Sequence, residues 1–169
     1  MDALTCLMTR RSIRKYAPGD VSDDLLRKLL AAAMAAPSAG NAQPWHFVAM
    51  RDRATLDEIA NFHPYAKMVR DAPLAVLVCA ELAREKYQGF WVQDCSAATM
   101  NLLLAAHALG LGGVWVGVYP VEDRMENFRR LLGLPAGVVP FALAPLGHPG
   151  QKAGDRKSTR LNSSHDQSS

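Results

Sequence analysis

The sequence feature that most constrains the fold is the stretch of residues 88–110, QGFWVQDCSAATMNLLLAAHALG, which is typical of one long helix. It carries a single charged side chain, Asp94, and has apolar or small residues on nearly every face. A helix that is apolar all round must be covered on all sides. One domain of this size can bury one side of the helix, and a partner chain can bury the other. The spacing predicts an inward stripe of Trp91, Cys95, Ala98, Leu102, Ala105 and Leu109.

An ordinary core helix and a membrane span are the competing interpretations of this stretch. Polar side chains argue against a span, because they interrupt the apolar surface at several heights. Those side chains are Gln93, Asp94, Ser96, Thr99, Asn101 and His107. Gly110 and the pair Gly112 and Gly113 then end the helix. We therefore expect no membrane association.

Length and charge predict one domain over residues 1–156 of the 169-residue chain. The hydrophobic fraction of 49% and the charged fraction of 21% are typical of a soluble globular protein. The net charge of +3 comes from 19 basic and 16 acidic residues, and residues 151–169 hold four of those bases and two of those acids. The remaining residues, 1–150, therefore carry 15 basic and 14 acidic side chains. A body so close to neutral argues against nucleic-acid binding, which needs a basic stripe.

The three cysteines, Cys6, Cys79 and Cys95, lie far apart in apolar settings without metal-ligand spacing. They are typical of buried thiols in a reducing compartment. The N-terminus carries Asp2 and no apolar core of a secretion signal. We therefore expect a cytoplasmic protein and predict no metal site.

A basic cluster follows a short helix expected over residues 2–9. Arg10, Arg11, Ser12 and Arg14 place three guanidiniums and a hydroxyl within five residues. Arginine offers planar paired donors and is always charged, so the cluster suits a phosphate. Arginines at helix ends are also commonly solvated, and cations there complement the helix dipole. On these residues alone, both interpretations stay open.

The least generic stretch is PSAGNAQPW at residues 37–45. It follows a helix that Ser22 caps, with Asp23 and Asp24 in its first turn. Pro37 ends that helix. Small residues in the loop permit close approach of a ligand, and its amide and hydroxyl groups can bind the edge of a polar ring.

The remaining pattern predicts strands alternating with helices. The continuous apolar run at 73–80 suits the centre of a sheet. Pro140 and Pro145 predict that the last strand lies at an edge or pairs irregularly. The expected strands are 45–50, 73–80, 113–119 and 138–146, and the expected helices between them are 54–62 and 121–132.

The character of the chain changes from residue 157 onward. The segment KSTRLNSSHDQSS has one aliphatic residue, Leu161, and no periodicity. It predicts a polar tail over residues 157–169 that is disordered in isolation or foreign to the rest of the chain.

Four stretches together resemble the FMN-dependent nitroreductase family: RRSIRKY, AAPSAGNAQPWHFV, QDCSAATMNLLLAAHALGLGGVWVG and VPFALAPLGHP. The resemblance runs from residue 9 to about residue 156 in the expected order. It implies an α+β, nitroreductase-like fold, in which helices flank a central mixed, mostly antiparallel sheet and one long helix is buried. It also implies an intertwined homodimer with FMN at the subunit interface, which supplies the partner chain that the apolar helix needs.

The resemblance assigns the basic cluster to the cofactor. Arg10 and Ser12 match positions that hold the FMN phosphate and ribityl chain, with Arg11 beside them. Arg14 matches a basic position near the pyrimidine edge of the ring. Arg156 matches a second phosphate-binding arginine.

The resemblance also assigns residues around the flavin ring. Lys67 matches a cation near the ring. The loop that the second subunit lays against the flavin is matched by Pro37, Ser38 and Asn41, and the backbone on the other side of the ring by Gly113 and Val114.

The implied activity is that of an FMN-dependent oxidoreductase working by a ping-pong cycle. Hydride passes from NADH or NADPH through FMN to a small acceptor such as a nitroaromatic or a quinone. Because the flavin does the chemistry, we predict no catalytic side chain. The chain has no Gly-rich dinucleotide fingerprint, which fits a nicotinamide that visits the flavin face. The alternatives are a specialised flavin reaction on the same fold and a flavin-binding protein with little turnover.

Two features depart from the family pattern. Met100 stands where many relatives have a glutamate. From Lys157 onward the chain lacks the apolar and aromatic arm with which relatives run along the partner subunit. We hypothesise that the missing arm weakens the dimer.

Overall fold

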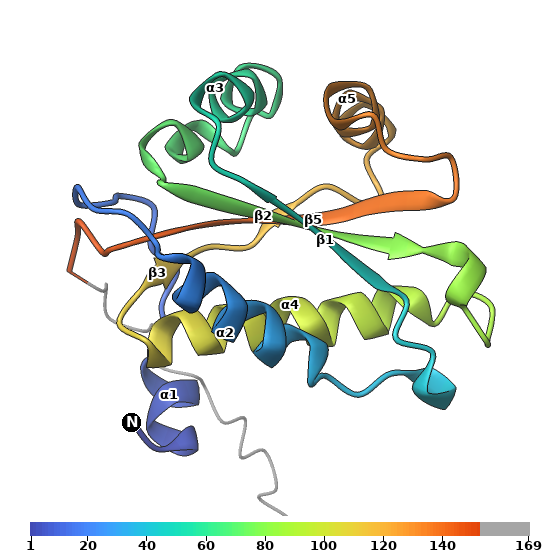
Figure 1. The fold of residues 1–169 in the computed structure, drawn as a ribbon, viewed down its shortest axis with the longest axis horizontal. Coiled ribbons are helices and arrows are strands. Elements are labelled where there is room, and N and C mark those ends of the chain that lie inside the picture. The colour runs from blue at the N-terminus through green and yellow to red at the C-terminus, as the bar shows by residue number, and fades with distance from the viewer. Residues whose placement is uncertain (153–169) are drawn as a thin grey trace, which may run out of the picture.

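The computed structural model describes residues 1–152. These residues form a central sheet with helices on both faces (Figure 1). Helices α2 (Asp23–Met34) and α4 (Trp91–Ala108) cover one face, with α1 (Ala3–Thr9) packed on α4. Helices α3 (Arg53–Phe62) and α5 (Glu122–Leu132) cover the other face. The predicted α+β arrangement with a long central helix is confirmed. The predicted tail, residues 157–169, lies outside the described residues.

The strand order of the sheet is β1-β2-β5-β3, with β4 also paired to β5, and every ladder is antiparallel. The apolar strand β2 lies between β1 and β5, as its continuous hydrophobic run predicts. The strands are β1 (Trp45–Met50), β2 (Leu74–Glu81), β3 (Gly112–Gly113), β4 (Val116–Gly117) and β5 (Val138–Gly147).

The strand predicted at 113–119 is interrupted and forms β3 and β4. Gly113 pairs with Leu146 and Val116 pairs with Leu143, so both pieces keep one antiparallel register along β5. This register places Val114 opposite Pro145. Proline has no N–H to donate to a ladder, which explains the break.

Strand β5 is not an edge strand, so that half of the proline prediction is wrong. β5 pairs with β2 on one side and with β3 and β4 on the other. The other half, irregular pairing, is confirmed, because Val78 pairs with Ala142 and the next residue pairs with Pro140. Phe141, which lies between these two residues of β5, has no paired residue in β2. Its carbonyl accepts the N–H groups of Val118 and Tyr119 at 3.2 and 2.9 Å. A bulge thus accommodates the proline inside the sheet.

Helix α4 packs between the sheet and α2. Its inward stripe matches the prediction as far as Leu102, but Ala106 is buried in place of Ala105, and Leu109 is 37% exposed. The 3.6-residue period of the helix carries the stripe from Leu102 to Ala106. The buried residues of α4 are Trp91, Asp94, Cys95, Ala98, Thr99, Leu102, Leu103 and Ala106.

The predicted helix signals are confirmed in detail. Ser22 caps α2 by accepting the N–H of Leu25 at 3.2 Å. Gly133 ends α5 in the left-handed conformation, with φ of 60°. Within residues 1–152, no helix is long and apolar enough to cross a membrane.

His63 links the α3 side of the molecule to the sheet and is fully buried. Its Nε2 lies 3.0 Å from the carbonyl of Gly117, and its Nδ1 accepts the N–H of Tyr65 at 3.3 Å. Burial lowers the pKa of His63 below its ordinary value of 6.5, and the nearby Arg124 lowers it further. The folded protein therefore holds this imidazole neutral, with the proton on Nε2.

We expect the free energy of unfolding to decrease as the pH falls from about 7.5 to about 5.5. The unfolded chain protonates His63 near its ordinary pKa of 6.5, and the folded chain does so only at lower pH. His63→Gln keeps a nitrogen donor for Gly117 and removes the titration, so it should flatten this slope in urea unfolding. His46→Gln, at an exposed position, serves as the control. An equal slope in the wild type and His63→Gln would contradict the assignment.

Candidate functional site

Residues 10–14 form an extended segment that lies along β3. Helix α1 ends at Thr9, and Ser12 then forms a parallel bridge with Gly113. The N–H of Ile13 donates to the carbonyl of Gly113 at 3.0 Å. A Cβ atom on Gly112 would come within 2.7 Å of the Ile13 side chain, so this close approach requires glycine. The glycine pair after α4 therefore positions the arginine segment.

The side chains of the arginine segment point alternately to two sides, because the segment is extended. Ile13 is buried in the protein. From this alternation we infer that Arg10, Ser12 and Arg14 lie toward the opposite side. By the same alternation Arg11 starts on the side of Ile13. Its guanidinium donates to the carbonyls of Met8 and Arg10 at 2.8 and 2.9 Å. Two arginines and a hydroxyl on one side are a donor set that suits a phosphoester.

Gly113 and Val114 lie beside this segment, and both are buried. A Cβ atom on Gly113 would lie 2.6 Å from Leu146, so the protein's own packing uses the space that this glycine leaves. Gly117 on β4 is different, because a Cβ atom there would meet nothing within 4 Å. The sequence-based prediction did not single out Gly117, whose backbone is uncovered on that side. Its only signal is a glycine inside a strand pattern.

The predicted loop with Pro37, Ser38 and Asn41 is held against the first turn of α4. Asp94, the one charged residue in that helix, is only 5% exposed and accepts the N–H of Ala39 at 2.9 Å. Ser38 accepts the N–H of Gln43 through its hydroxyl at 3.0 Å. Asn41 has a φ of 54°, a conformation that asparagine tolerates better than most residues.

A second set of contacts holds the tip of the loop. Lys86 donates to the carbonyl of Gly40 at 2.7 Å. A Cβ atom on Gly40 would lie 2.7 Å from the Tyr87 ring, so the turn before α4 lies directly on this glycine. The loop is thus fixed in one conformation by α4 and the turn that precedes it.

The two halves of the predicted flavin site lie at opposite ends of α4 within one chain. Asp94, which holds the loop, is in the first turn of this 18-residue helix. His107, next to the arginine segment through its contact with Thr9, is in the last turn. At 1.5 Å per residue, the two turns are about 20 Å apart. A single chain therefore does not bring Ser38 and Asn41 to Arg10 and Ser12.

The last two predicted residues are Lys67 and Arg156. Lys67 begins the short 3₁₀ helix Lys67–Asp71, which packs with α3, and its ammonium donates to the carbonyl of Ala60 at 3.0 Å. Its assignment to the flavin stays a prediction. Arg156 lies outside the described residues.

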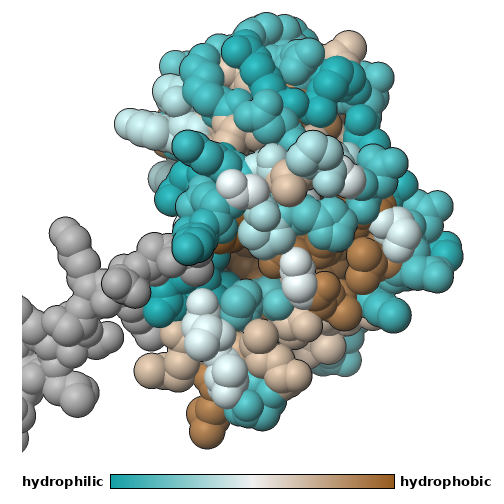
Figure 2. All heavy atoms as spheres, turned by 90° about the vertical axis from the view of Figure 1, so that its left-hand side faces the viewer, coloured by the Kyte–Doolittle hydropathy of each residue, from teal (hydrophilic) through white to brown (hydrophobic). Residues whose placement is uncertain are grey.

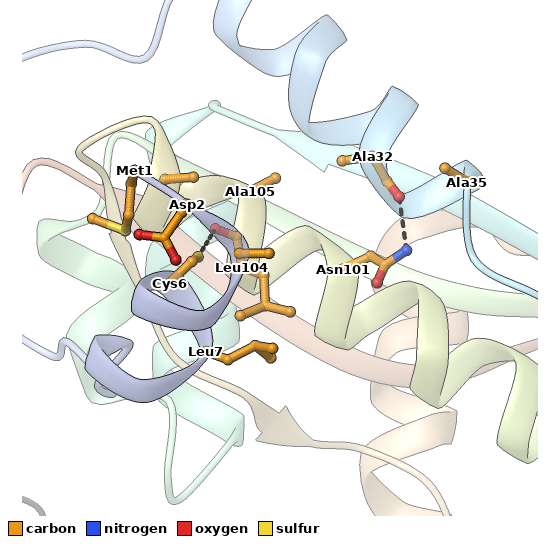
Figure 3. Close-up of a pocket in the computed structure, with 11 residues that line it drawn as sticks. Met1, Asp2, Cys6, Leu7, Ala32, Ala35, Asn101, Leu104 and Ala105 are labelled. Atoms are coloured by element: carbon orange, nitrogen blue, oxygen red, sulfur yellow. Dashed lines mark hydrogen bonds between the residues drawn. The ribbon is translucent and has the colours of Figure 1, made fainter.

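An apolar groove of about 500 Å³ runs between α1, α2 and the second half of α4. Figure 3 shows Leu7 of α1 and Leu104 and Ala105 of α4 along it. Figure 2 shows the end of the molecule on which α1 lies, with polar residues above and paler, more apolar residues below, on the α1 side. The exposed large apolar residues of α1 and its N-terminus are Met1, Leu4, Leu7 and Met8.

The buried cysteines are not suited to nucleophilic chemistry. Burial raises the pKa of Cys79 and of Cys95 to about 12. Both thiols are free and inaccessible to solvent. Residues 1–152 contain no cluster of histidine, cysteine and carboxylate side chains that suits a metal ion. What the residues around β3 offer is cationic and hydroxyl donors for an anionic ligand.

Comparison with known proteins agrees with this geometry. The Nitroreductase family profile matches residues 7–63 and 61–148. A protein of Methanothermobacter thermautotrophicus, provisionally named NADH dehydrogenase/NAD(P)H nitroreductase, is 54% identical over 92% of this chain and 82% of its own length. A Bacteroides thetaiotaomicron structure with the same provisional name has a TM-score of 0.89 and 41% identity, covering 98% of each chain. A Desulfovibrio desulfuricans nitroreductase structure in complex with FMN has a TM-score of 0.82 and 33% identity, covering 95% of this chain and 94% of its own.

The chain therefore belongs to the nitroreductase family of NAD(P)H-dependent and flavin-dependent oxidoreductases. The predicted family and fold are confirmed.

We expect Asp94→Ala to lower the free energy of unfolding by about 1–3 kcal/mol, because it leaves the part-buried N–H of Ala39 without its acceptor. Asp94→Asn keeps an oxygen acceptor and should lose less than half of that amount. Urea unfolding of both variants measures the effect, with Gln93→Ala on the exposed side of the same turn as the control. Wild-type stability of Asp94→Ala would show that the carboxylate does not hold the loop.

Proposed function

We propose that this protein is an FMN-dependent oxidoreductase that takes hydride from NADH or NADPH and passes it to a small acceptor, such as a nitroaromatic or a quinone, in alternating half-reactions. The observation that carries the proposal is that Arg10, Ser12 and Arg14 belong to one segment whose backbone is hydrogen-bonded to β3. The FMN complex of the Desulfovibrio desulfuricans relative supports the choice of flavin.

The arginine segment would hold the phosphate end of FMN. Arg10 would pair with the phosphate dianion through its guanidinium, and Ser12 would offer its hydroxyl beside it. Arg14 would place a cation near the pyrimidine edge of the ring, where positive charge favours the reduced form of a flavin. When bound, FMN supplies the hydride transfer itself. The protein's contribution is then binding, orientation and electrostatics.

No side chain of the described site is assigned a proton-transfer role. The Tyr16 hydroxyl lies 3.1 Å from the carbonyl oxygens of both Ile13 and Pro145 and shares its single hydrogen between them, and burial raises its pKa above the ordinary value of 10.0. Tyr16 thereby ties the arginine segment to β5. Protons for the acceptor come from solvent in this proposal.

A homodimer completes the site in this proposal. The loop of Ser38 and Asn41 and the segment of Arg10 and Ser12 lie about 20 Å apart along α4. A two-fold axis that sets two copies of α4 antiparallel brings the first turn of one helix to the last turn of the other. Each copy then contributes half of two equivalent flavin sites. The exposed apolar residues of α1 and the groove beside it are surface that a second copy would cover.

The proposed activity predicts a two-step spectroscopic assay. Protein reconstituted with FMN should lose its flavin absorbance when NADH or NADPH is added without oxygen, and regain it when a nitroaromatic or a quinone follows. Failure of both nicotinamides to reduce the bound flavin would overturn the proposal. Reduction without reoxidation by any acceptor would instead indicate a flavin-binding protein with little turnover.

We expect Arg10→Ala to weaken FMN binding by about 10-fold to 100-fold, because a charge-assisted hydrogen bond contributes about 1.5–3 kcal/mol. Lys152→Ala removes an exposed cation elsewhere and should change the dissociation constant less than about twofold. Fluorescence titration of FMN measures both constants. Equal effects of the two substitutions would refute the phosphate assignment.

A complementation experiment extends this prediction to the two-chain site. Asn41→Gly tolerates the positive φ of that position and removes the amide from the loop. In a random mixture of Arg10→Ala and Asn41→Gly chains, half of the dimers are mixed and each mixed dimer keeps one intact site. About a quarter of all sites should then bind FMN with wild-type affinity. No recovery on mixing would place both residues in a site within one chain.

A further inference from the structure

The side chain of Thr9, at the end of α1, contacts the side chain of His107 in the last turn of α4. The Thr9 hydroxyl oxygen lies 2.8 Å from Nε2 of His107 and 2.6 Å from the carbonyl of Thr5. A carbonyl only accepts, so the single hydroxyl hydrogen of Thr9 goes to Thr5. The contact with His107 therefore requires that the imidazole carries its hydrogen on Nε2 and donates it to Thr9.

The surroundings of His107 fit this assignment. Burial lowers the pKa of His107 below 6.5, and the positive charges of Arg10 and Arg11 lower it further. Among residues 1–152, those two arginines are the charged groups that influence it. The ring is accordingly neutral at neutral pH, and it places a hydrogen-bond donor beside the arginines without adding a third positive charge.

Helix α1 has few other attachments to the rest of the molecule. Cys6 is its one buried residue. The Cys6 thiol donates to the carbonyl of Leu104 on α4 at 3.3 Å (Figure 3). Because Arg10 is the C-cap of α1 and its N–H donates to the carbonyl of Cys6, the orientation of α1 sets where the Arg10 side chain begins. Within one chain, α1 is therefore oriented by its packing on α4, by the Cys6 hydrogen bond and by the hydrogen bond from His107 to Thr9.

We propose that His107 and Thr9 act together as positioning residues that hold Arg10 and Ser12 in place for the phosphate of the cofactor. This inference rests on the proposed function and adds a residue pair that need not touch the cofactor. Its consequence is selective: loss of the pair should weaken binding of a flavin that has a phosphate and spare a flavin that has none.

Comparison of FMN with riboflavin, which has the same ring and no phosphate, tests this selectivity. Thr9→Val and His107→Ala should each weaken FMN binding about fivefold, the equivalent of one hydrogen bond, and change riboflavin binding less than about twofold. His107→Gln places an amide nitrogen near the position of Nε2 and should restore FMN binding to within about twofold of the wild type. The double variant Thr9→Val/His107→Ala should be no weaker than either single variant, because both remove the same contact.

The outcomes separate this inference from the proposed function. If the wild type binds FMN and the variants bind it equally well, or if both flavins weaken by the same factor, the positioning role is overturned and the proposed function stands. If the wild type itself does not bind FMN, the proposed function fails and the inference fails with it. Circular dichroism and thermal unfolding of each variant confirm that the comparison is made between folded proteins.

Discussion

Burial of α4 between the sheet and helices α1 and α2 is the constraint on which the rest of this structure depends. The helix contacts strands β1, β2, β3 and β5 as well as both helices. Because its side chains are apolar on nearly every side, it cannot form the surface of a monomeric domain without exposing apolar area. The first turn of α4 holds the loop of residues 37–45, and the last turn holds α1 and the arginine segment.

The rigidity of α4 also explains why the two halves of the candidate site stay apart within one chain. A helix of this length separates its ends by a fixed distance, so no loop movement can join Ser38 to Arg10 while both remain attached to it. A two-fold symmetric pair resolves the separation without any change in the protomer. In this view the apolar helix, the two half-sites and the proposed homodimer are consequences of one packing arrangement, and the cofactor would be held by both copies.

Much of the architecture could be predicted because its signals are local. The Ser22 cap, the Gly133 cap and the apolar run of β2 depend on neighbouring residues, and each lies where the pattern indicates. The position of β5 could not be predicted in this way. Pro140 and Pro145 are unfavourable in an interior strand, but a bulge at Phe141 and the break between β3 and β4 accommodate them. Those adjustments involve partners far away in the sequence.

In the sequence by itself, four motifs indicated the family and the fold class through their resemblance to known proteins, and the arginine cluster indicated a residue type that suits a phosphate. It also marked Asp94 as the single charged residue of an apolar helix. Only the tertiary structure decided that Asp94 accepts the N–H of Ala39, that the Arg11 guanidinium donates to the carbonyls of Met8 and Arg10, and that His107 reaches Thr9 across two helix ends. The physical reason is that hydrogen bonds between distant segments depend on how whole helices pack, and no local pattern along the chain records that packing.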